Sequence, residues 1–385
     1  MPQPTALVIG GTGPTGPYVI DGLLARGFKV TMLNRGLHDS FMVPAEVDRL
    51  HADAFSIDTV ADALGSRTFD LGLVMYGRLR EIARLLVGRV GQLVTVGGNV
   101  VYEGYGTPTN LRPVGLPVPA REDIALSSTV PGPTTNTKIA RIVETEQVVF
   151  ETHPTAAHFR YPQIYGPRQL IPREWMIVRR ILDGRRRIIL PDGGHTLRAA
   201  AFCQNAAATL LSGVDQPEKA AGQAFNVSDD WTPTLRQVVE MIADAMDVTV
   251  EVAGMPHAIA TPARPFLVYA DEFHRHTPND KARYTLGHVN PVTVQDGVRQ
   301  TVDWLLKNRP DDAAFSTQSG DPFNYAAEDA LLAHWDSLIE TARPTAEAAD
   351  PGYVDRYNAA FDATGRPQQW VLTTRPPVEA PEESR

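Results

Sequence analysis

Apolar and polar residues alternate along the first hundred positions in the way that a β-α fold requires. Apolar and β-branched runs with the length of buried strands fall at residues 5–9, 28–33, 47–51, 71–75 and 93–96. After the first run, Val19, Ile20, Leu23 and Leu24 recur at helical spacing. A second amphipathic helix is expected between the last two runs. Strands that alternate with helices predict an α/β protein built on a doubly wound parallel sheet.

A glycine-rich turn joins the first predicted strand to the first predicted helix. Gly10, Gly13 and Gly16 are spaced so that the chain turns sharply, a pyrophosphate approaches the backbone amides and the helix packs on the strand. This is the phosphate-binding turn of a Rossmann fold. We therefore expect cofactor contacts from Gly10, Thr12, Gly13, Pro14, Thr15 and Gly16.

The second strand closes on Asn34-Arg35-Gly36, about twenty residues beyond the glycine turn. NAD-selective sites place a carboxylate there, whereas an arginine accepts the 2′-phosphate of NADP(H). Arg35, with no acid beside it, favours NADP(H). Further cofactor contacts are expected in the segments that follow the third and fourth strands. Together with those after the second strand, the expected contacts are Asn34, Arg35, Asp53, Ala54, Tyr76 and Gly77.

Several separated segments resemble the extended and atypical branches of the short-chain dehydrogenase/reductase superfamily, which include nucleotide-sugar epimerases and dehydratases. The likeness is carried by residues 8–13, 34–36, 160–167, 224–227, 280–283 and 286–287, and it spans residues 5–307. The resemblance implies the Rossmann core, a nicotinamide cofactor, and further cofactor contacts at Pro162 and Ile164.

The resemblance also implies a catalytic serine, and a tyrosine four residues before a lysine on the next helix. Here Gly98 stands at the serine position and Thr134 at the tyrosine position, while Lys138 is retained. An aliphatic hydroxyl has a pKa of about 15 against about 10 for tyrosine, so Thr134 is a poor final proton donor. The resemblance implies that Lys138 holds the nicotinamide ribose.

A substitute proton donor is expected among Tyr102, Tyr105, Tyr76 and His195, and we favour Tyr105. The glycine- and proline-rich loop 97–133 that carries two of them is long enough to be an active-site wall or lid. The catalytic candidates are therefore Lys138, Thr134, Tyr105 and Tyr102.

The substrate half is expected to follow the core. Arg198 stands where the resemblance places an arginine on a nucleotide-sugar diphosphate, which suits an anionic substrate. Gln204 and Asn205 occupy a segment where an aspartate is usual, so nucleotide-sugar specificity does not carry over. The substrate contacts that we expect are Arg198, His195 and Gly98.

Composition excludes several classes of protein. A net charge of −9 argues against nucleic acid, and the basic cluster at residues 179–187 is interpreted as a solvated helix end. One cysteine, Cys203, permits no intrachain disulfide or cysteine-rich metal site, and we expect no metal. No leader pattern or membrane-length apolar run is present, which predicts a cytoplasmic protein, with a homodimer as the default assembly.

Three parts are predicted: a Rossmann core at 1–166, a smaller α+β substrate-binding portion at 167–309, and a C-terminal extension at 310–385. In the extension, an apolar stripe at 331–339 predicts one helix that packs on its own domain or a second subunit, and 376–385 is expected to be disordered.

The leading functional hypothesis is an NADP(H)-dependent oxidoreductase acting on a small carbonyl, alcohol or activated alkene, with a nonstandard residue or water supplying the proton. A redox-neutral isomerase, epimerase or lyase, and a non-catalytic NADP(H) sensor, are the alternatives.

Overall fold

The computed structural model describes residues 2–36 and 43–352. The chain divides into a compact unit that ends at Glu328 and a second unit that begins at Asp329, and each is described by itself.

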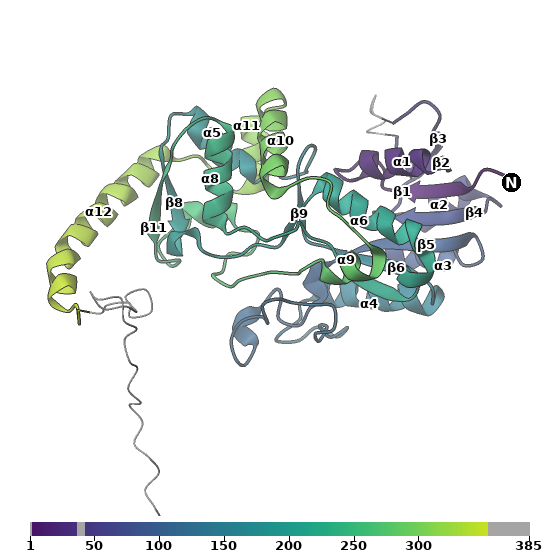
Figure 1. Ribbon diagram of the computed structural model, residues 1–385, viewed down its shortest axis with the longest axis horizontal. Coiled ribbons are helices and arrows are strands. Elements are labelled where there is room, and N and C mark those ends of the chain that lie inside the picture. Colours follow the sequence, from purple (N-terminus) through teal and green to yellow (C-terminus); the bar gives the residue numbers. More distant parts are fainter. Residues whose placement is uncertain (1, 37–42, 353–385) are drawn as a thin grey trace, which may run out of the picture. The chain divides into compact units, whose positions relative to one another are not determined.

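A parallel sheet of seven strands forms the centre of the first unit, in the order β10-β6-β5-β4-β1-β2-β3 (Figure 1). Its strands are β1 Thr5–Ile9, β2 Lys29–Asn34, β3 Asp48–His51, β4 Phe69–Val74, β5 Val90–Gly98, β6 Ala157–Tyr161 and β10 Gln223–Asn226. The five strands predicted from the sequence are confirmed, with shifts of a few residues at their ends. In the register, Ile9 pairs with Leu33 and with Val74, so β1, β2 and β4 end side by side.

Helices cover both faces of this sheet, which confirms the doubly wound arrangement. One apolar core is shared with α1 Gly16–Ala25, α6 Cys203–Asp215, α7 Pro217–Ala220 and α9 Asp280–Leu286. The core on the opposite face is shared with α2 Ile57–Leu64, α3 Leu79–Leu85 and α4 Thr137–Thr152. Both faces of the inner strands are therefore buried, as their nearly continuous apolar sequence requires.

Two small parallel sheets and a separate apolar core extend the first unit. The sheets pair β8 Arg187–Pro191 with β11 Glu251–Met255, and β7 Gln163–Tyr165 with β9 Ala200–Phe202. The remaining helices of this unit are α5 Glu174–Leu182, α8 Leu235–Ala245, α10 Val294–Lys307 and α11 Asp312–Ser319. Short 3₁₀ turns are η1 Asn99–Val101, η2 Pro108–Asn110, η3 Asp192–Gly194 and η4 Thr261–Phe266.

The basic cluster on α5 is not uniformly solvated, which corrects the sequence interpretation. The Arg180 side chain is only 2% exposed, and it donates to Asp321 Oδ2 at 2.7 Å and to Glu328 Oε1 at 2.5 Å. The two carboxylates come from residues more than 140 positions away, so the sequence pattern around Arg180 could not reveal them.

The helix predicted at 331–339 is present as part of α12, Tyr325–Ala348, and the predicted disordered end at 376–385 lies outside the described residues. None of the helices in the described part of the chain is both long and apolar enough to cross a bilayer.

A buried ion pair ties the central sheet to the long loop between β5 and α4. The Arg160 guanidinium donates to both oxygens of Glu146, at 3.0 and 2.6 Å, and to the Tyr102 hydroxyl at 2.9 Å. That hydroxyl donates in turn to Asn226 Oδ1 at 2.5 Å. Burial alone would raise the pKa of Glu146, but the hydrogen bonds from Arg160 outweigh it and lower that pKa. The pair is thus ionised in the core.

His158, next to this pair, makes the stability of the fold depend on pH. Burial lowers its pKa from 6.5 to about 4, and its Nδ1 lies 2.7 Å from Thr95 Oγ1. Below pH 6.5 the unfolded chain takes up a proton that the folded protein refuses until about pH 4. Stability from this group is therefore present above pH 6.5 and is lost as the pH falls through that window.

The unfolding free energy should fall between pH 7 and pH 4.5 in both the wild type and the His158→Gln variant. We predict that this fall is roughly 2–3 kcal/mol smaller in the variant than in the wild type. Gln retains a polar group for Thr95 and carries no titration. Urea unfolding at both pH values measures the difference, and equal losses in the two proteins would contradict the assignment.

Candidate functional site

Two adjoining cavities lie at the carboxyl ends of the central strands, where open α/β sheets bind ligands. The first, called here the glycine-turn cavity, has a volume of about 350 Å³. The second, the arginine cavity, has a volume of about 450 Å³. Four residues line both: Pro14, Tyr161, Ile164 and Leu170. A ligand can therefore extend from one cavity into the other.

Most of the predicted cofactor residues line the glycine-turn cavity: Gly10, Thr12, Gly13, Pro14, Thr15, Asn34, Arg35, Ala54, Tyr76 and Ile164. They gather there because β1, β2 and β4 end side by side and the turn after β1 runs directly into α1. Thr15 is the N-cap residue of α1, and its side chain makes no capping hydrogen bond. In the first turn, the Gly16 amide donates to the Gly13 carbonyl at 3.1 Å and Pro17 has no N–H, so the attraction for an anion comes chiefly from the helix dipole.

The predicted cofactor residues Gly16, Asp53 and Gly77 are not among the described residues that line this cavity. Gly16 packs against Gly11, whose carbonyl oxygen would lie 2.1 Å from a Cβ at position 16. The Asp53 carboxylate accepts a hydrogen bond from the Phe55 amide at 3.0 Å, so it closes a turn. Gly77 packs on Ala54. In this structure the three residues shape the backbone next to the cavity, and their contact with a cofactor stays a prediction.

The arginine cavity contains three guanidinium groups, on Arg173, Arg198 and Arg275. Arg275 is paired with Asp271 at 2.7 Å. Arg198 donates only to a neutral partner, the Gln163 side chain at 3.1 Å, and has no ion pair with any described residue. Burial lowers the pKa of Arg198 to about 10; the Glu174 carboxylate opposes this shift, and the neighbouring Arg173 and Arg275 add to it. The cavity is therefore suited to an anion that compensates Arg198.

Of the proton donors expected from the sequence, Tyr105 lies in the wall of the arginine cavity. Burial raises its pKa, with a small opposing effect from a hydrogen bond to Asn99, so the phenol stays protonated at neutral pH. Asn99 and Val100 line the same cavity. The long loop 97–133 thus supplies part of the wall.

Tyr102 is elsewhere: its side chain is fully buried, and its hydroxyl is committed to Asn226. His195 is exposed at the end of η3, although the next residues, Thr196 to Arg198, line the arginine cavity. Neither Tyr102 nor His195 is among the lining residues found in the described ranges. The structure does not bring these two candidates to the reacting space.

The retained lysine motif differs from the sequence prediction in its placement. Asn136 caps α4, so Thr134 precedes the helix instead of lying on it, and its carbonyl accepts from Thr107 at 3.0 Å. Lys138 is exposed in the first turn of α4. Gly98 ends β5. Among the described residues that line the two cavities, none of Thr134, Lys138 and Gly98 appears.

Sequence reasoning missed Tyr161, which lines both cavities, and the pair of arginines that accompanies Arg198. Tyr161 carried a signal, because it ends β6 beside the predicted contacts Pro162 and Ile164. Arg275 carried none: it lies in an irregular segment, and its guanidinium reaches the site by stacking 4.1 Å from the ring centre of Tyr269.

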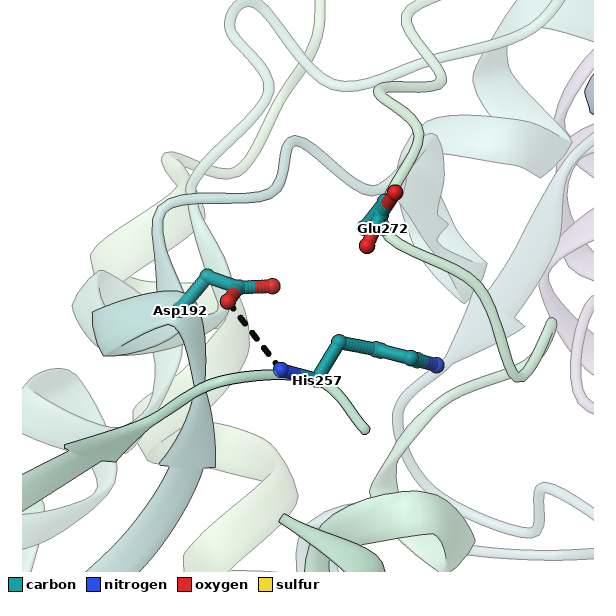
Figure 2. Close-up of side chains that lie close together, drawn as sticks. All are labelled: Asp192, His257 and Glu272. Carbon is teal, nitrogen blue, oxygen red and sulfur yellow. Dashed lines mark hydrogen bonds between the residues drawn. The ribbon is translucent and has the colours of Figure 1, made fainter. Parts of the chain in front are cut away.

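A group of metal-ligand residues lies beside the arginine cavity, at the carboxyl ends of β8 and β11. The side chains of Asp192, His257 and Glu272 come from three segments, and their ligand atoms lie within 4.8 Å of one another (Figure 2). Asp192 Oδ1 accepts a hydrogen bond from the His257 amide at 3.1 Å. Asp192 and Glu272 are exposed, as acidic surface groups commonly are.

Comparison with known proteins supports the fold. No family model matches the chain. A 3-diazoavenalumate denitrifying reductase from a Streptomyces species is 25% identical over 300 residues, which cover 73% of this chain and 94% of that protein. The uncharacterized protein y4nL of Sinorhizobium fredii is 26% identical over 170 residues, which cover 39% of this chain and 47% of that protein.

Two solved structures illustrate the similarity in three dimensions. A UDP-glucose 4-epimerase from Bifidobacterium longum, in complex with NAD+ and UDP, has a TM-score of 0.60 and 16% identity, covering 79% of this chain and 98% of that one. A dTDP-glucose 4,6-dehydratase from Bacillus anthracis, in complex with NAD, has a TM-score of 0.59 and 15% identity, covering 79% and 97%. The chain thus has the fold of the extended short-chain dehydrogenase/reductase enzymes, and the resemblance drawn from its sequence is confirmed at that level.

Two glycine substitutions separate the binding and folding roles of the turn. A Cβ at Gly13 meets nothing within 4 Å, and Gly13 lines the glycine-turn cavity. We predict that Gly13→Ala changes the unfolding free energy by less than about 0.5 kcal/mol but weakens NADPH binding about tenfold, because the methyl group takes up space next to the amides.

Gly16→Ala is the matched variant. We expect it to lower the unfolding free energy by about 1–3 kcal/mol, because the added Cβ overpacks against Gly11. Thermal unfolding and nucleotide fluorescence measure both quantities. Retained NADPH affinity in Gly13→Ala would show that phosphates do not bind at this turn.

Proposed function

We propose that the protein is an NADP(H)-dependent reductase whose substrate carries a carboxylate. The observation that carries this proposal is the pair of adjoining cavities. One holds the glycine turn and Arg35, and the other holds Arg198, which has no carboxylate within ion-pair distance in the described part of the chain.

The nicotinamide dinucleotide is supported by the cavity and by the fold. The glycine turn, the N-terminus of α1 and the ends of β2 and β4 surround one cavity, and structures of this fold are described as complexes with NAD. Arg35 favours the 2′-phosphate of NADP(H), because it is exposed after the end of β2 and neither of its neighbours in the sequence, Asn34 and Gly36, is acidic.

A reduction is supported by the relative that aligns over 94% of its own length, which is named a reductase. The bound dinucleotide would supply the hydride. In this chain Tyr105 is the one predicted catalytic residue that lines the arginine cavity. Burial raises its pKa, which keeps the phenol protonated but makes it a weaker acid, so the assignment rests on its position in the cavity wall. We assign it the proton that balances hydride addition, with Arg198 holding the substrate carboxylate.

A redox-neutral reaction is the second candidate, because the epimerase and the dehydratase share this fold. The two candidates differ in stoichiometry. A reductase consumes one NADPH for each product, whereas an epimerase or lyase turns over with catalytic amounts of bound nucleotide. The replacement of the usual serine and tyrosine by Gly98 and Thr134 also agrees with a nucleotide sensor, which would bind without turnover.

The cofactor assignment predicts that Arg35→Ala weakens NADPH binding about tenfold or more and leaves NADH binding within about twofold. The reason is that only the 2′-phosphate loses a charge-assisted partner. Calorimetric titration of wild type and variant measures both affinities. Equal effects on the two nucleotides would remove the NADP(H) preference, and no binding of either to the wild type would refute the reductase.

The substrate assignment predicts that the NADP+-loaded protein binds carboxylates in preference to their methyl esters, which have the same shape without the charge. A panel of aromatic and aliphatic acids paired with their esters is titrated by calorimetry. For any acid that binds, we expect the ester to bind at least about tenfold more weakly, and Arg198→Met to abolish this difference. Acids and esters that bind alike would contradict an anion site at Arg198.

A further inference from the structure

One buried hydroxyl at the junction of the two cavities is not used by the fold. Tyr161 ends β6 and lines both cavities. Its hydroxyl oxygen is inaccessible to solvent and makes no hydrogen bond of standard geometry among the described residues, although Thr15 lies close enough to oppose the effect of burial on its pKa. Buried polar groups in folded proteins are nearly always satisfied, and an exception at a ligand cavity points to a missing partner.

The neighbouring tyrosines show that this is particular to Tyr161. The Tyr102 hydroxyl donates to Asn226 Oδ1 at 2.5 Å, and the Tyr165 hydroxyl donates to Asp229 Oδ2 at 2.8 Å. Both hydroxyls therefore hold structure together. The Tyr161 hydroxyl has no such structural partner. The Thr15 hydroxyl next to it uses its proton on the Met75 sulfur at 3.7 Å and so does not donate to the Tyr161 oxygen.

The surroundings of the Tyr161 hydroxyl define what it can bind. It lies beside Thr15, the N-cap residue of α1, where the helix dipole attracts an anion. Burial raises the pKa of Tyr161, so the phenol remains a donor at neutral pH. A protonated hydroxyl next to a helix N-terminus is complementary to a phosphate oxygen.

We propose that the Tyr161 hydroxyl donates a hydrogen bond to the pyrophosphate of the bound dinucleotide, at the point where the nucleotide passes from the glycine-turn cavity into the arginine cavity. The inference rests on the proposed nucleotide-binding function and adds a contact that the glycine motif does not contain. It makes Tyr161 a cofactor-binding residue whose hydroxyl serves the ligand and contributes nothing to folding.

The test compares Tyr161→Phe with the wild type against two probes: NADPH, and adenosine 2′-monophosphate, which has the 2′-phosphate but no pyrophosphate. We expect the variant to lose about tenfold in NADPH affinity and to bind adenosine 2′-monophosphate within twofold of the wild type. Arg35→Ala should weaken both probes. Calorimetry measures NADPH binding, and ligand-observed NMR titration measures the weaker monophosphate.

Stability without nucleotide is the second measurement. Removing an unsatisfied hydroxyl should leave the melting temperature of Tyr161→Phe unchanged or higher, whereas Tyr165→Phe should melt lower because it breaks the bond to Asp229. Tyr284→Phe is the matched control for binding, since Tyr284 is 88% exposed on α9 and lines neither cavity among the described residues.

The outcomes separate the two proposals. Wild-type protein that binds no NADPH refutes the proposed function itself. Wild-type protein that binds NADPH, with unchanged affinity in Tyr161→Phe, refutes the pyrophosphate contact alone. Equal losses for both probes, or a lower melting temperature, would also refute it, because the hydroxyl would then act through the fold.

Discussion

The buried ion pair between Arg160 and Glu146 is the interaction on which the site depends. Two charges in the core are tolerated because each satisfies the other and because a third guanidinium N–H donates to the Tyr102 hydroxyl. Tyr102 then holds Asn226, whose amide groups bond to Ala120 and Glu122 in the long loop. A loop without regular secondary structure is thus fixed over the sheet, and its residues Asn99, Val100 and Tyr105 become a defined cavity wall.

Two of the three arginines of the arginine cavity show why one guanidinium is structural and another is available to a ligand. Arg275 has its counterion in Asp271 and donates to the Tyr105 carbonyl, so it holds the wall together. Arg198 is half-buried beside the amide of Gln163, which carries no charge. Because a buried cation without a counterion is unfavourable, an anionic group entering the cavity removes this penalty as it binds.

The nucleotide half of the site follows the pattern of the fold, whereas the reacting half is rearranged. The glycine turn, the end of β2 and the end of β4 converge on one cavity, as in the enzymes that share this architecture. At the other cavity the usual serine and tyrosine positions are Gly98 and Thr134, and Lys138 is exposed. A fold of this kind positions a cofactor, but the side chains around it decide the chemistry. The tyrosines that face this space, Tyr105 and Tyr161, come from different elements than the motif predicts.

The sequence alone determined the strands, the parallel sheet and the cofactor turn, because each depends on residues close together in the chain. Periodicity identified β1 and α1, and the spacing of three glycines identified the turn between them. Only the tertiary structure decided which polar side chains meet. Arg180 meets Asp321 from more than 140 positions away, and Tyr102 is buried on Asn226 and not in the cavity. The sequence did not single out Tyr161, and only packing places it where the two cavities adjoin. Contacts between distant segments depend on how the elements pack, and local pattern carries no record of that packing.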